Sequence, residues 1–469
     1  MIASNGMPSK IGSLRCDGTG SKGNVSVGQQ TMTGAPPGPK GRFVTGSIAE
    51  FKADPLALFL DLQKTYGDVV SLQLATTKSV LLSHPDHVQY VLRTNRRNYS
   101  KRTRGIQYLR EILGDGLLTI IDEDRWVHNR RTMQPVFRHD SLDNFAAIIA
   151  ELTAGMLDEW GEQVPVAPNM TRLTLKIAGR CFFATELGET DDIGRAFVEV
   201  MEINQNRFRA AFCAPLWMPT AQNRRFRRAL NVLHTQMVAL IEERRAAPGD
   251  DLLSRLIEAC DEETGEGLLT DELRDEAITM LGAGHETTAN ALIFTLDLLA
   301  RNPDQYALLR KEALAGWSGD APTLAELKGL TYTNACINES MRLNPPAWVF
   351  GRLAEACDNI GGFDIEAGTL VMMSPFVTHR RADIWDDPLE FRPERFIEKD
   401  PDRHPFAFYP FSGGPRSCIG KYFGMMEMLI IVSMIARHCP KLTRINPEVV
   451  GWDPLVTLRP KDDVPIRVV

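Results

Sequence analysis

The sequence predicts a mainly α-helical protein with a small β part, and three observations carry this fold class. Helical periodicity dominates from His84 to about Cys260. Thr270 to Arg301 reads as one continuous helix of about 30 residues, roughly 45 Å long. Strand signals appear in short runs before His84 and after Pro345. We therefore expect a helical bundle with a long central helix and small antiparallel sheets.

The composition excludes several classes of protein. Of 469 residues, 43% are hydrophobic, 24% charged and 8% aromatic, which is typical of a globular protein with a large core. The formal net charge of -7 would repel a phosphate backbone, so we expect no nucleic-acid partner. The apolar stretch at 428–436 falls well short of the roughly 20 residues that cross a bilayer. We therefore expect no membrane span.

The chain begins with residues 1–35, a stretch rich in Gly, Ser, Thr and Asn that predicts a disordered polar tail. The proline-rich run at 35–39 then opens the fold. No linker follows, so residues 36–469 are expected to form a single domain. The eight cysteines show no CxxC pair and no zinc-like spacing, and no signal peptide is visible, which favours a reducing cytoplasm.

The elements follow in order along the chain. Residues 54–67 resemble a capped amphipathic helix, and the apolar runs 69–74 and 79–83 read as a hairpin. Turns at 114–116, 165–168 and 214–219 interrupt the helical region after His84.

The long central helix contains Gly282 and Gly284, each of which costs up to about 1 kcal/mol relative to alanine. Glycine at these positions suggests that something approaches the backbone closely. Strand and turn signals at 358–370 predict a small sheet, and helix returns over 418–438.

The stretch with the clearest chemistry is 411–420 (FSGGPRSCIG), a glycine-rich loop that brings Cys418 to the start of a helix. Helix N-termini lower the pKa of a thiol, so we expect a thiolate. Phe411 can shield the sulfur from water, and Arg416 supplies a nearby cation. A buried cysteine that caps a helix is the alternative, but it leaves these flanking residues unexplained.

The pattern F-x-x-G-x-R-x-C-x-G resembles that of the cytochrome P450 haem-thiolate enzymes. The resemblance implies the P450 fold around one haem b, iron protoporphyrin IX, with iron bound by Cys418. Weaker motifs follow in the family's order. Glu339 and Arg342 lie one helical turn apart, and in the family Arg395 would complete a structural triad with them. Spacing alone is weak, because Glu242 and Arg245 match it.

The segment from Trp126 to Arg130 resembles the helix that binds the haem propionates in this family. Trp348 and Arg352 repeat its spacing, but only Trp126 lies on an early helix. Arg352 and Arg416 are further propionate candidates, against the alternative of surface salt bridges.

Residues 283–288 (AGHETT) resemble the family's oxygen-activation segment. Ala283 and Gly284 would lie over the haem and leave room for dioxygen, while Glu286 and Thr287 would relay protons to it. The alternative is a threonine bonded to its own helix and a glutamate on the wet face. His285 is expected to serve packing only.

The resemblance implies monooxygenation, by hydroxylation or epoxidation, in secondary metabolism. Electrons would come from NAD(P)H through a reductase and a separate, acidic ferredoxin or flavodoxin that meets Arg130, Arg131, Arg138 and Lys421. The expected substrate is a medium-sized apolar molecule of terpenoid, polyketide or fatty acyl type, and the enzyme is expected to be a monomer. Pocket candidates by family position are Leu117, Leu118, Trp348, Val349, Phe350 and Val456. A haem-thiolate isomerase, dehydratase or peroxygenase, or a non-catalytic recruitment protein, are the alternatives, and both would usually lack the acid–alcohol pair.

Overall fold

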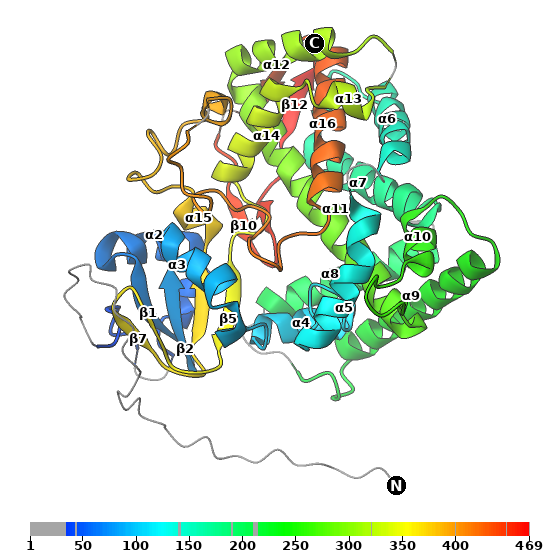
Figure 1. Ribbon diagram of the computed structural model, residues 1–469. Coiled ribbons are helices and arrows are strands. Elements are labelled where there is room, and N and C mark those ends of the chain that lie inside the picture. The colour runs from blue at the N-terminus through cyan, green and yellow to red at the C-terminus, as the bar shows by residue number, and fades with distance from the viewer. Residues whose placement is uncertain are drawn as a thin grey trace.

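The computed structural model describes residues 34–42, 45–138, 142–188, 191–209, 214–319, 321–398, 400–446 and 448–468. Apart from residues 34 and 35, the predicted polar tail lies outside this part of the chain. A β-rich part and a larger helical part lie side by side (Figure 1). The predicted fold class is confirmed.

The β-rich part is built around a five-stranded sheet in the order β1-β2-β8-β5-β3. Its neighbours are antiparallel except β2 and β8, which run parallel with Val80 opposite Val371. The sheet is therefore mixed, where the sequence suggested antiparallel pairing alone. The elements of this part are α1 (Ile48–Ala53), α2 (Pro55–Tyr66), β1 (Val69–Leu74), β2 (Thr77–Leu82), α3 (Pro85–Gln89), a π-helix (Tyr90–Thr94), a 3-10 turn (Arg96–Asn98), β3 (Tyr99–Ser100), β5 (Phe350–Ala354), β6 (Asp358–Ile360), β7 (Phe363–Ile365), β8 (Leu370–Met373) and α15 (Pro375–Thr378).

The predicted helix and hairpin at the start of this part form for local reasons. Asp54 caps α2, because its Oδ1 accepts hydrogen bonds from the backbone N–H of Leu56 at 3.1 Å and of Ala57 at 2.9 Å. The helix ends at Gly67, whose φ of 93° is readily adopted only by glycine. The strands β1 and β2 then pair over their full length.

The helical part surrounds α11 (Thr270–Arg301), which runs through the middle of the molecule (Figure 1). Its other helices are α4 (Arg104–Leu113), α5 (Glu123–Met133), α6 (Asp143–Asp158), α7 (Val166–Phe183), α8 (Asp192–Arg209), α9 (Ala221–Ala246), α10 (Leu252–Glu258), α12 (Pro303–Gly316), α13 (Leu324–Leu327), α14 (Thr331–Leu343) and α16 (Lys421–His438), with 3-10 turns at Gln134–Phe137 and Pro393–Phe396. Small strands complete it: β4 (Gln163–Pro165), β9 (Leu442–Arg444), β10 (Trp452–Pro454), β11 (Leu458–Pro460) and β12 (Pro465–Val468).

The predicted turn at 165–168 is wrong, because α7 already begins at Val166. Pro168 occupies its first turn, where a backbone N–H would have no partner inside the helix anyway, so proline costs little there. The side-chain amide of Asn169 donates to the carbonyl of Pro165 at 2.8 Å and supports this start.

The central helix α11 is buried along most of its length, between α7, α9, α14 and α16. At its N-terminus the backbone N–H of Leu269 donates to the Glu272 carboxylate at 2.9 Å. Ala283 is exposed in mid-helix, although most of its neighbours are covered. No helix in the described part of the chain is long and apolar enough to cross a membrane.

Candidate active site

The loop that carries Cys418 joins the β-rich part to α16. The backbone N–H of Cys418 donates to the carbonyl of Phe411 at 3.0 Å and closes the loop. Gly414 has a φ of 69°, and a Cβ there would lie 2.1 Å from the carbonyl oxygen of Leu92. The loop therefore requires glycine at this point, because any side chain would push it off the π-helix that supports it.

The Cys418 side chain is accessible, although protein surrounds it closely. Burial raises the pKa of its thiol, while the Gly420 N–H, Arg130 and Lys421 act in the opposite direction. Without a metal ion, the surrounding protein therefore favours the neutral thiol of Cys418 over the thiolate. One reason is that α16 begins only at Lys421, three residues later than predicted. A bound metal ion would supply the missing positive charge, since it deprotonates a coordinating thiol outright.

The segment 283–288 lies at the middle of α11. The hydroxyl of Thr287 donates to the carbonyl of Ala283 at 2.7 Å, and Thr288 bonds the carbonyl of Gly284 at 2.9 Å. The first turn of α16 packs on this segment, because a Cβ at Gly424 would lie 3.8 Å from the Thr288 hydroxyl. The structure thus brings the acid–alcohol pair of α11 near the helix that follows Cys418.

Gly284 has a different role from the one expected. A Cβ at this residue would lie 3.0 Å from the ring of Phe182 on α7. Its missing side chain therefore lets α7 and α11 pack closely, and the position open to the interior is Ala283 instead. His285 serves packing as expected: its ring meets Phe197 edge-on at 5.9 Å, and burial lowers its pKa to about 4.

Glu286 is held by a neighbour from outside the helix. The hydroxyl of Thr457 donates to its Oε1 at 2.7 Å. The Nδ2 of Asn290, one turn further along α11, donates to the same hydroxyl at 3.2 Å. Glu286 is half-buried, so the acid has a fixed side-chain partner and remains partly accessible.

Four cations gather beside the Cys418 loop: Lys101, Arg130, Arg352 and Arg416. Burial together with Arg352, Arg416 and Arg130 lowers the pKa of Lys101 well below its usual value. Burial and the charge of Arg416 likewise lower the pKa of Arg352 to about 10. We refer to these four residues as the cation cluster.

The carboxylate that faces this cluster is that of Glu123, which pairs with Arg416 at 2.7 Å. Arg416 also lies over the ring of Trp126, with 4.4 Å from its guanidinium carbon to the ring centre. Arg130 donates to the backbone carbonyl of Ser417 at 2.9 Å and Arg352 to that of Gly351 at 2.9 Å. Within the described residues, neither of these two arginines has a carboxylate partner. The cluster is thus suited to a ligand with carboxylate groups.

The predicted Glu339 triad is assembled. The Glu339 carboxylate receives two bonds from Arg342, at 2.7 and 2.8 Å, and one from Arg395 at 3.2 Å. Glu339 and Arg342 are fully buried, and Arg342 also donates to the carbonyls of His379 and Pro388. By contrast, Glu242 and Arg245 form an exposed pair, as the alternative for that spacing requires.

The pocket candidates separate into two groups. Leu118 is 38% exposed, Val349 and Val456 are half-buried, and Leu117 is buried beside Leu118. Trp348 is 2% exposed; its ring packs 6.0 Å from that of Phe59 and its indole N–H donates to the carbonyl of Leu455 at 3.0 Å. Trp348 is therefore enclosed by Phe59 and the backbone of Leu455, and it supports the neighbouring residue Val349 instead of facing a ligand itself. The ring of Phe350 likewise lies against Tyr409 in the β-rich part, with 6.2 Å between ring centres.

These residues fit a flat group that carries both iron and carboxylates. Cys418, Ala283 and Leu118 are exposed, and hydrogen bonds of Arg130, Lys101 and Glu276 tie the segments that carry them to one region. We refer to the space between α11, the loop of Leu118 and the Cys418 loop as the hollow. A sulfur ligand lies on one side of it and the acid–alcohol pair on another. The cation cluster provides the charge that such a group's carboxylates would need.

Three residues of this region were not singled out in the sequence: Lys101, Glu276 and Thr457. Glu276 on α11 accepts from the backbone N–H of Leu117 at 2.9 Å and from Asn129 at 3.0 Å. Burial raises its pKa to about 7. Each of the three forms a hydrogen bond with a residue more than 15 positions away in the sequence, so no local pattern could have revealed it.

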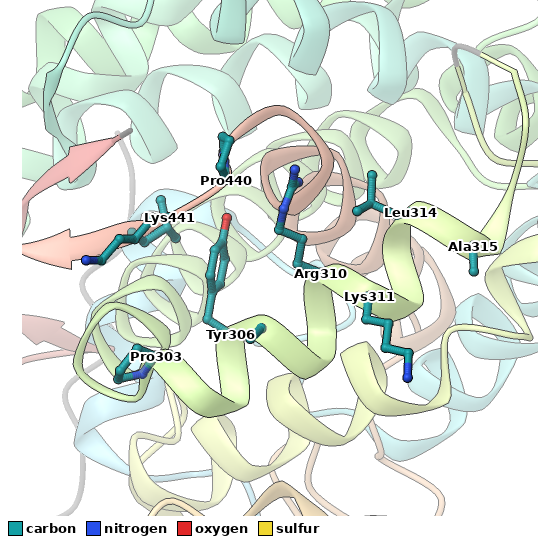
Figure 2. A pocket seen from close by; sticks show the side chains of 10 residues that line it. Pro303, Tyr306, Arg310, Lys311, Leu314, Ala315, Pro440 and Lys441 are labelled. Atoms are coloured by element: carbon teal, nitrogen blue, oxygen red, sulfur yellow. The ribbon is translucent and has the colours of Figure 1, made fainter.

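A groove of about 640 Å³ lies elsewhere, between α12 and the segment that follows α16 (Figure 2). Tyr306 and Arg310 line it, but their polar ends are already bonded to the carbonyls of Cys439 and Ala436. Lys311 and Lys441 point away from one another (Figure 2). The groove therefore offers no set of converging groups for chemistry.

Comparison with known proteins gives a consistent result. The family model of cytochrome P450 matches residues 36–447. The chain is 33% identical over 391 residues to the cyclooctat-9-en-7-ol 5-monooxygenase of Streptomyces melanosporofaciens, which covers 81% of this chain and 83% of the relative. It is 31% identical over 408 residues to the pentalenene oxygenase of Streptomyces avermitilis, covering 84% and 88%. A cytochrome P450 4c3 of Drosophila melanogaster is 28% identical over 484 residues, covering 92% and 88%.

Proposed function

Because the chain belongs to the cytochrome P450 family and is a P450 monooxygenase, we propose that it inserts one oxygen atom from O2 into a medium-sized apolar substrate by hydroxylation or epoxidation. The observation that carries this proposal is the exposed Cys418, with four cations beside its loop and α11 packed on the helix that follows it. We further propose that residues 36–469 act as one catalytic domain, since the site draws side chains from α5, α11, β5 and the Cys418 loop.

The family implies a haem-iron cofactor, and we propose haem b, bound through Cys418. The chain has no CxxC pair for covalent haem attachment, and the cation cluster suits two propionates. Trp126, Arg130, Arg352 and Arg416 would hold these carboxylates, and Lys101 would assist. Ala283 would lie beside the group, and Phe411 would cover the sulfur. When bound, the haem binds and activates O2, with electron donation from the thiolate.

The residues of α11 would supply the protons. Thr287 can keep its hydroxyl on the Ala283 carbonyl or turn it toward the hollow, where it would hold a water. Glu286, held at one oxygen by Thr457, can pass a proton in from its accessible side. This acid–alcohol pair favours monooxygenation over an isomerase, dehydratase, peroxygenase or recruitment role.

For the substrate we propose a terpenoid. Two relatives are named for oxidising pentalenene and cyclooctat-9-en-7-ol, which by their names are an alkene and an unsaturated alcohol. Leu118, Val349 and Val456 would give a substrate of this kind an apolar surface with few polar groups. Polyketides and fatty acyl chains remain in the test set because the same surface would accept them.

For the electron donor we propose an acidic ferredoxin or flavodoxin, reduced by NAD(P)H through a reductase. Arg131, Arg138 and Lys421 are exposed and could meet it, whereas Arg130 is turned inward to Ser417. Arg131→Glu should weaken the binding of the ferredoxin, so that the apparent dissociation constant rises at low salt. Arg172→Glu on α7 should leave this constant unchanged. Equal effects of both variants would remove this face as the docking site.

We also propose that the enzyme is a cytoplasmic monomer. In the described part of the chain five cysteines are free and one, Cys357, is disulfide-bonded, and the excess of free thiols favours a reducing compartment. Size-exclusion chromatography with light scattering would test the monomer.

The central experiment is reconstitution with haem. The reduced carbonyl complex should show the red-shifted band of thiolate ligation, and Cys418→His should abolish it, while Cys260→Ser leaves it unchanged. A screen of terpenoids by haem spin-state change would then find substrates. Oxidation must consume O2 and NAD(P)H in proportion to product. Turnover with peroxide alone would favour the peroxygenase, and binding without any turnover would favour a recruitment protein.

A further inference from the structure

Leu117 and Leu118 lie in the loop between α4 and α5, which spans residues 114–122 and borders the hollow. The backbone of this loop is held at two adjacent points by buried side chains from different parts of the chain. We propose that Lys101 and Glu276 together fix Leu117 and Leu118, and so set the orientation in which the substrate lies. This inference rests on the proposed function, because it assigns these leucines to the substrate pocket.

The first anchor is Glu276, which is fully buried on α11. Its Oε2 accepts from the backbone N–H of Leu117 at 2.9 Å, and its Oε1 accepts from the Nδ2 of Asn129 at 3.0 Å. Asn129 lies on α5, next to Arg130. One carboxylate therefore joins the loop, α5 and α11, which are three of the elements that surround the hollow.

The second anchor is Lys101, whose Nζ donates to the carbonyl oxygen of Leu118 at 2.7 Å. Lys101 is 8% exposed and follows β3, far from α11 in sequence. It also belongs to the cation cluster, because Arg352 and Arg416 both act on its charge. The same ammonium group thus faces the carboxylate site on one side and the substrate loop on the other.

The loop has little freedom to move away from these anchors. The backbone N–H of Asp115 donates to the Oδ2 of Asp275 at 2.8 Å. A Cβ at Gly114 would lie 2.1 Å from that same Asp275 oxygen, and a Cβ at Gly116 would lie 2.1 Å from the Thr279 hydroxyl. The backbone therefore lies directly on α11, and side-chain changes at Leu117 or Leu118 would act from a fixed position.

Charged groups from α4, α5, α11 and the loop lie near Glu276. Asp275 and Glu272 lie on its own helix and raise its pKa. Asp115, on the loop, pairs with Arg110 of α4 at 2.6 Å and with Arg125 of α5 at 3.6 Å. Arg110 and Arg125 are thus paired with Asp115. No cation in the described part of the chain forms a salt bridge with Glu276 itself. Its two hydrogen-bond donors are the neutral backbone N–H of Leu117 and the side-chain amide of Asn129.

Hydrogen exchange of the Leu117 amide tests the first anchor without any need for turnover. Glu276→Met keeps an unbranched side chain but removes the acceptor, so exchange at Leu117 should speed up at least about tenfold. Glu276→Gln should exchange like the parent, because its amide oxygen can accept from Leu117. Its amide nitrogen can then donate to the Oδ1 of Asn129, which has no partner in the parent, once the Asn129 amide flips. If Glu276→Met folds poorly, Lys101→Met still tests the anchoring of this loop, because it removes the bond to the Leu118 carbonyl.

Substrate binding tests the proposed consequence. Lys101→Met and Glu276→Met should each weaken the binding of a hit from the spin-state screen about fivefold or more, and change the ratio of its oxidised products. The double variant should lose less than the product of the two single effects, because both anchors hold one loop. Lys64→Met, at the exposed end of α2, removes the same charge and should change neither quantity.

The outcomes separate the two proposals. If the parent shows no thiolate band and no spin-state change, the proposed function fails first. If the parent binds substrate but Lys101→Met and Glu276→Met leave affinity and product ratio unchanged, the anchoring role is refuted while the function stands. Fully multiplicative effects in the double variant would likewise overturn the joint role of the two residues.

Discussion

Replacing Glu339 with glutamine would test whether the buried triad stabilises the fold. The variant keeps the volume of the side chain but removes the carboxylate that faces Arg342 and Arg395. Both guanidinium groups are almost fully buried, with side-chain exposures of 0% and 6%. Breaking a buried ion pair by removing one partner costs about 3–5 kcal/mol, since the remaining charge has no compensation.

The expected shift in melting temperature follows from the size of the chain. At about 2.1 cal/mol/K per residue, 469 residues give an unfolding entropy near 1 kcal/mol/K. A loss of about 3–5 kcal/mol therefore lowers the melting temperature by roughly 3–5 °C. Arg395→Met should cost less, because it leaves the two shorter bonds between Glu339 and Arg342 in place.

Differential scanning calorimetry at one scan rate, on haem-loaded protein, would measure these shifts. Glu242→Gln is the matched control, because Glu242 and Arg245 have the same spacing but side-chain exposures of 58% and 34%. We expect it to shift the melting temperature by less than about 1 °C. Equal shifts for Glu339→Gln and Glu242→Gln would refute the reasoning that burial distinguishes the two pairs.

Three further predictions concern α11. Thr287→Ala should retain haem but divert electrons to peroxide, so that product formed per NAD(P)H falls at least about tenfold; full coupling would contradict the proton relay. Thr457→Val should lower the same ratio roughly threefold by freeing Glu286, and an unchanged solvent isotope effect would argue against a role for this contact. Because burial raises the pKa of Glu276 from 4.5 to about 7, the folded state binds its proton more tightly, so stability should fall as pH rises between these values. Glu276→Gln should abolish that fall, which is at most about 3.4 kcal/mol, in urea titrations at several pH values.

Much of the fold follows from local signals in the sequence. The bounds predicted for the central helix agree with α11, because its apolar periodicity is long and its N-terminus carries a capping glutamate. The run 69–74 agrees with β1 for a similar reason, since a short apolar stretch follows a glycine stop. The start of α7 does not follow from the sequence, because proline is common both in turns and in the first turn of a helix.

The site was less accessible to such reasoning. A motif places Glu286 on α11, but it cannot show that Thr457 holds the acid from a distant turn. The motif also does not show which neighbour Gly284 packs against. In the structure that neighbour is Phe182 on α7. Sequence spacing gives the order of residues along a helix, whereas contacts between elements depend on how the helices pack.

The close approach of Gly284 to Phe182 has a consequence for comparing relatives. A methyl group at position 284 would lie 3.0 Å from the ring. Alanine there therefore requires the Phe182 ring to shift by a few tenths of an ångström, or a smaller side chain at position 182. We therefore expect covariation across an alignment: relatives with a larger residue at the position of Gly284 should carry a smaller one at that of Phe182. Chimeras that exchange α7 alone between such relatives should then express poorly, whereas exchanging α7 together with α11 should restore expression.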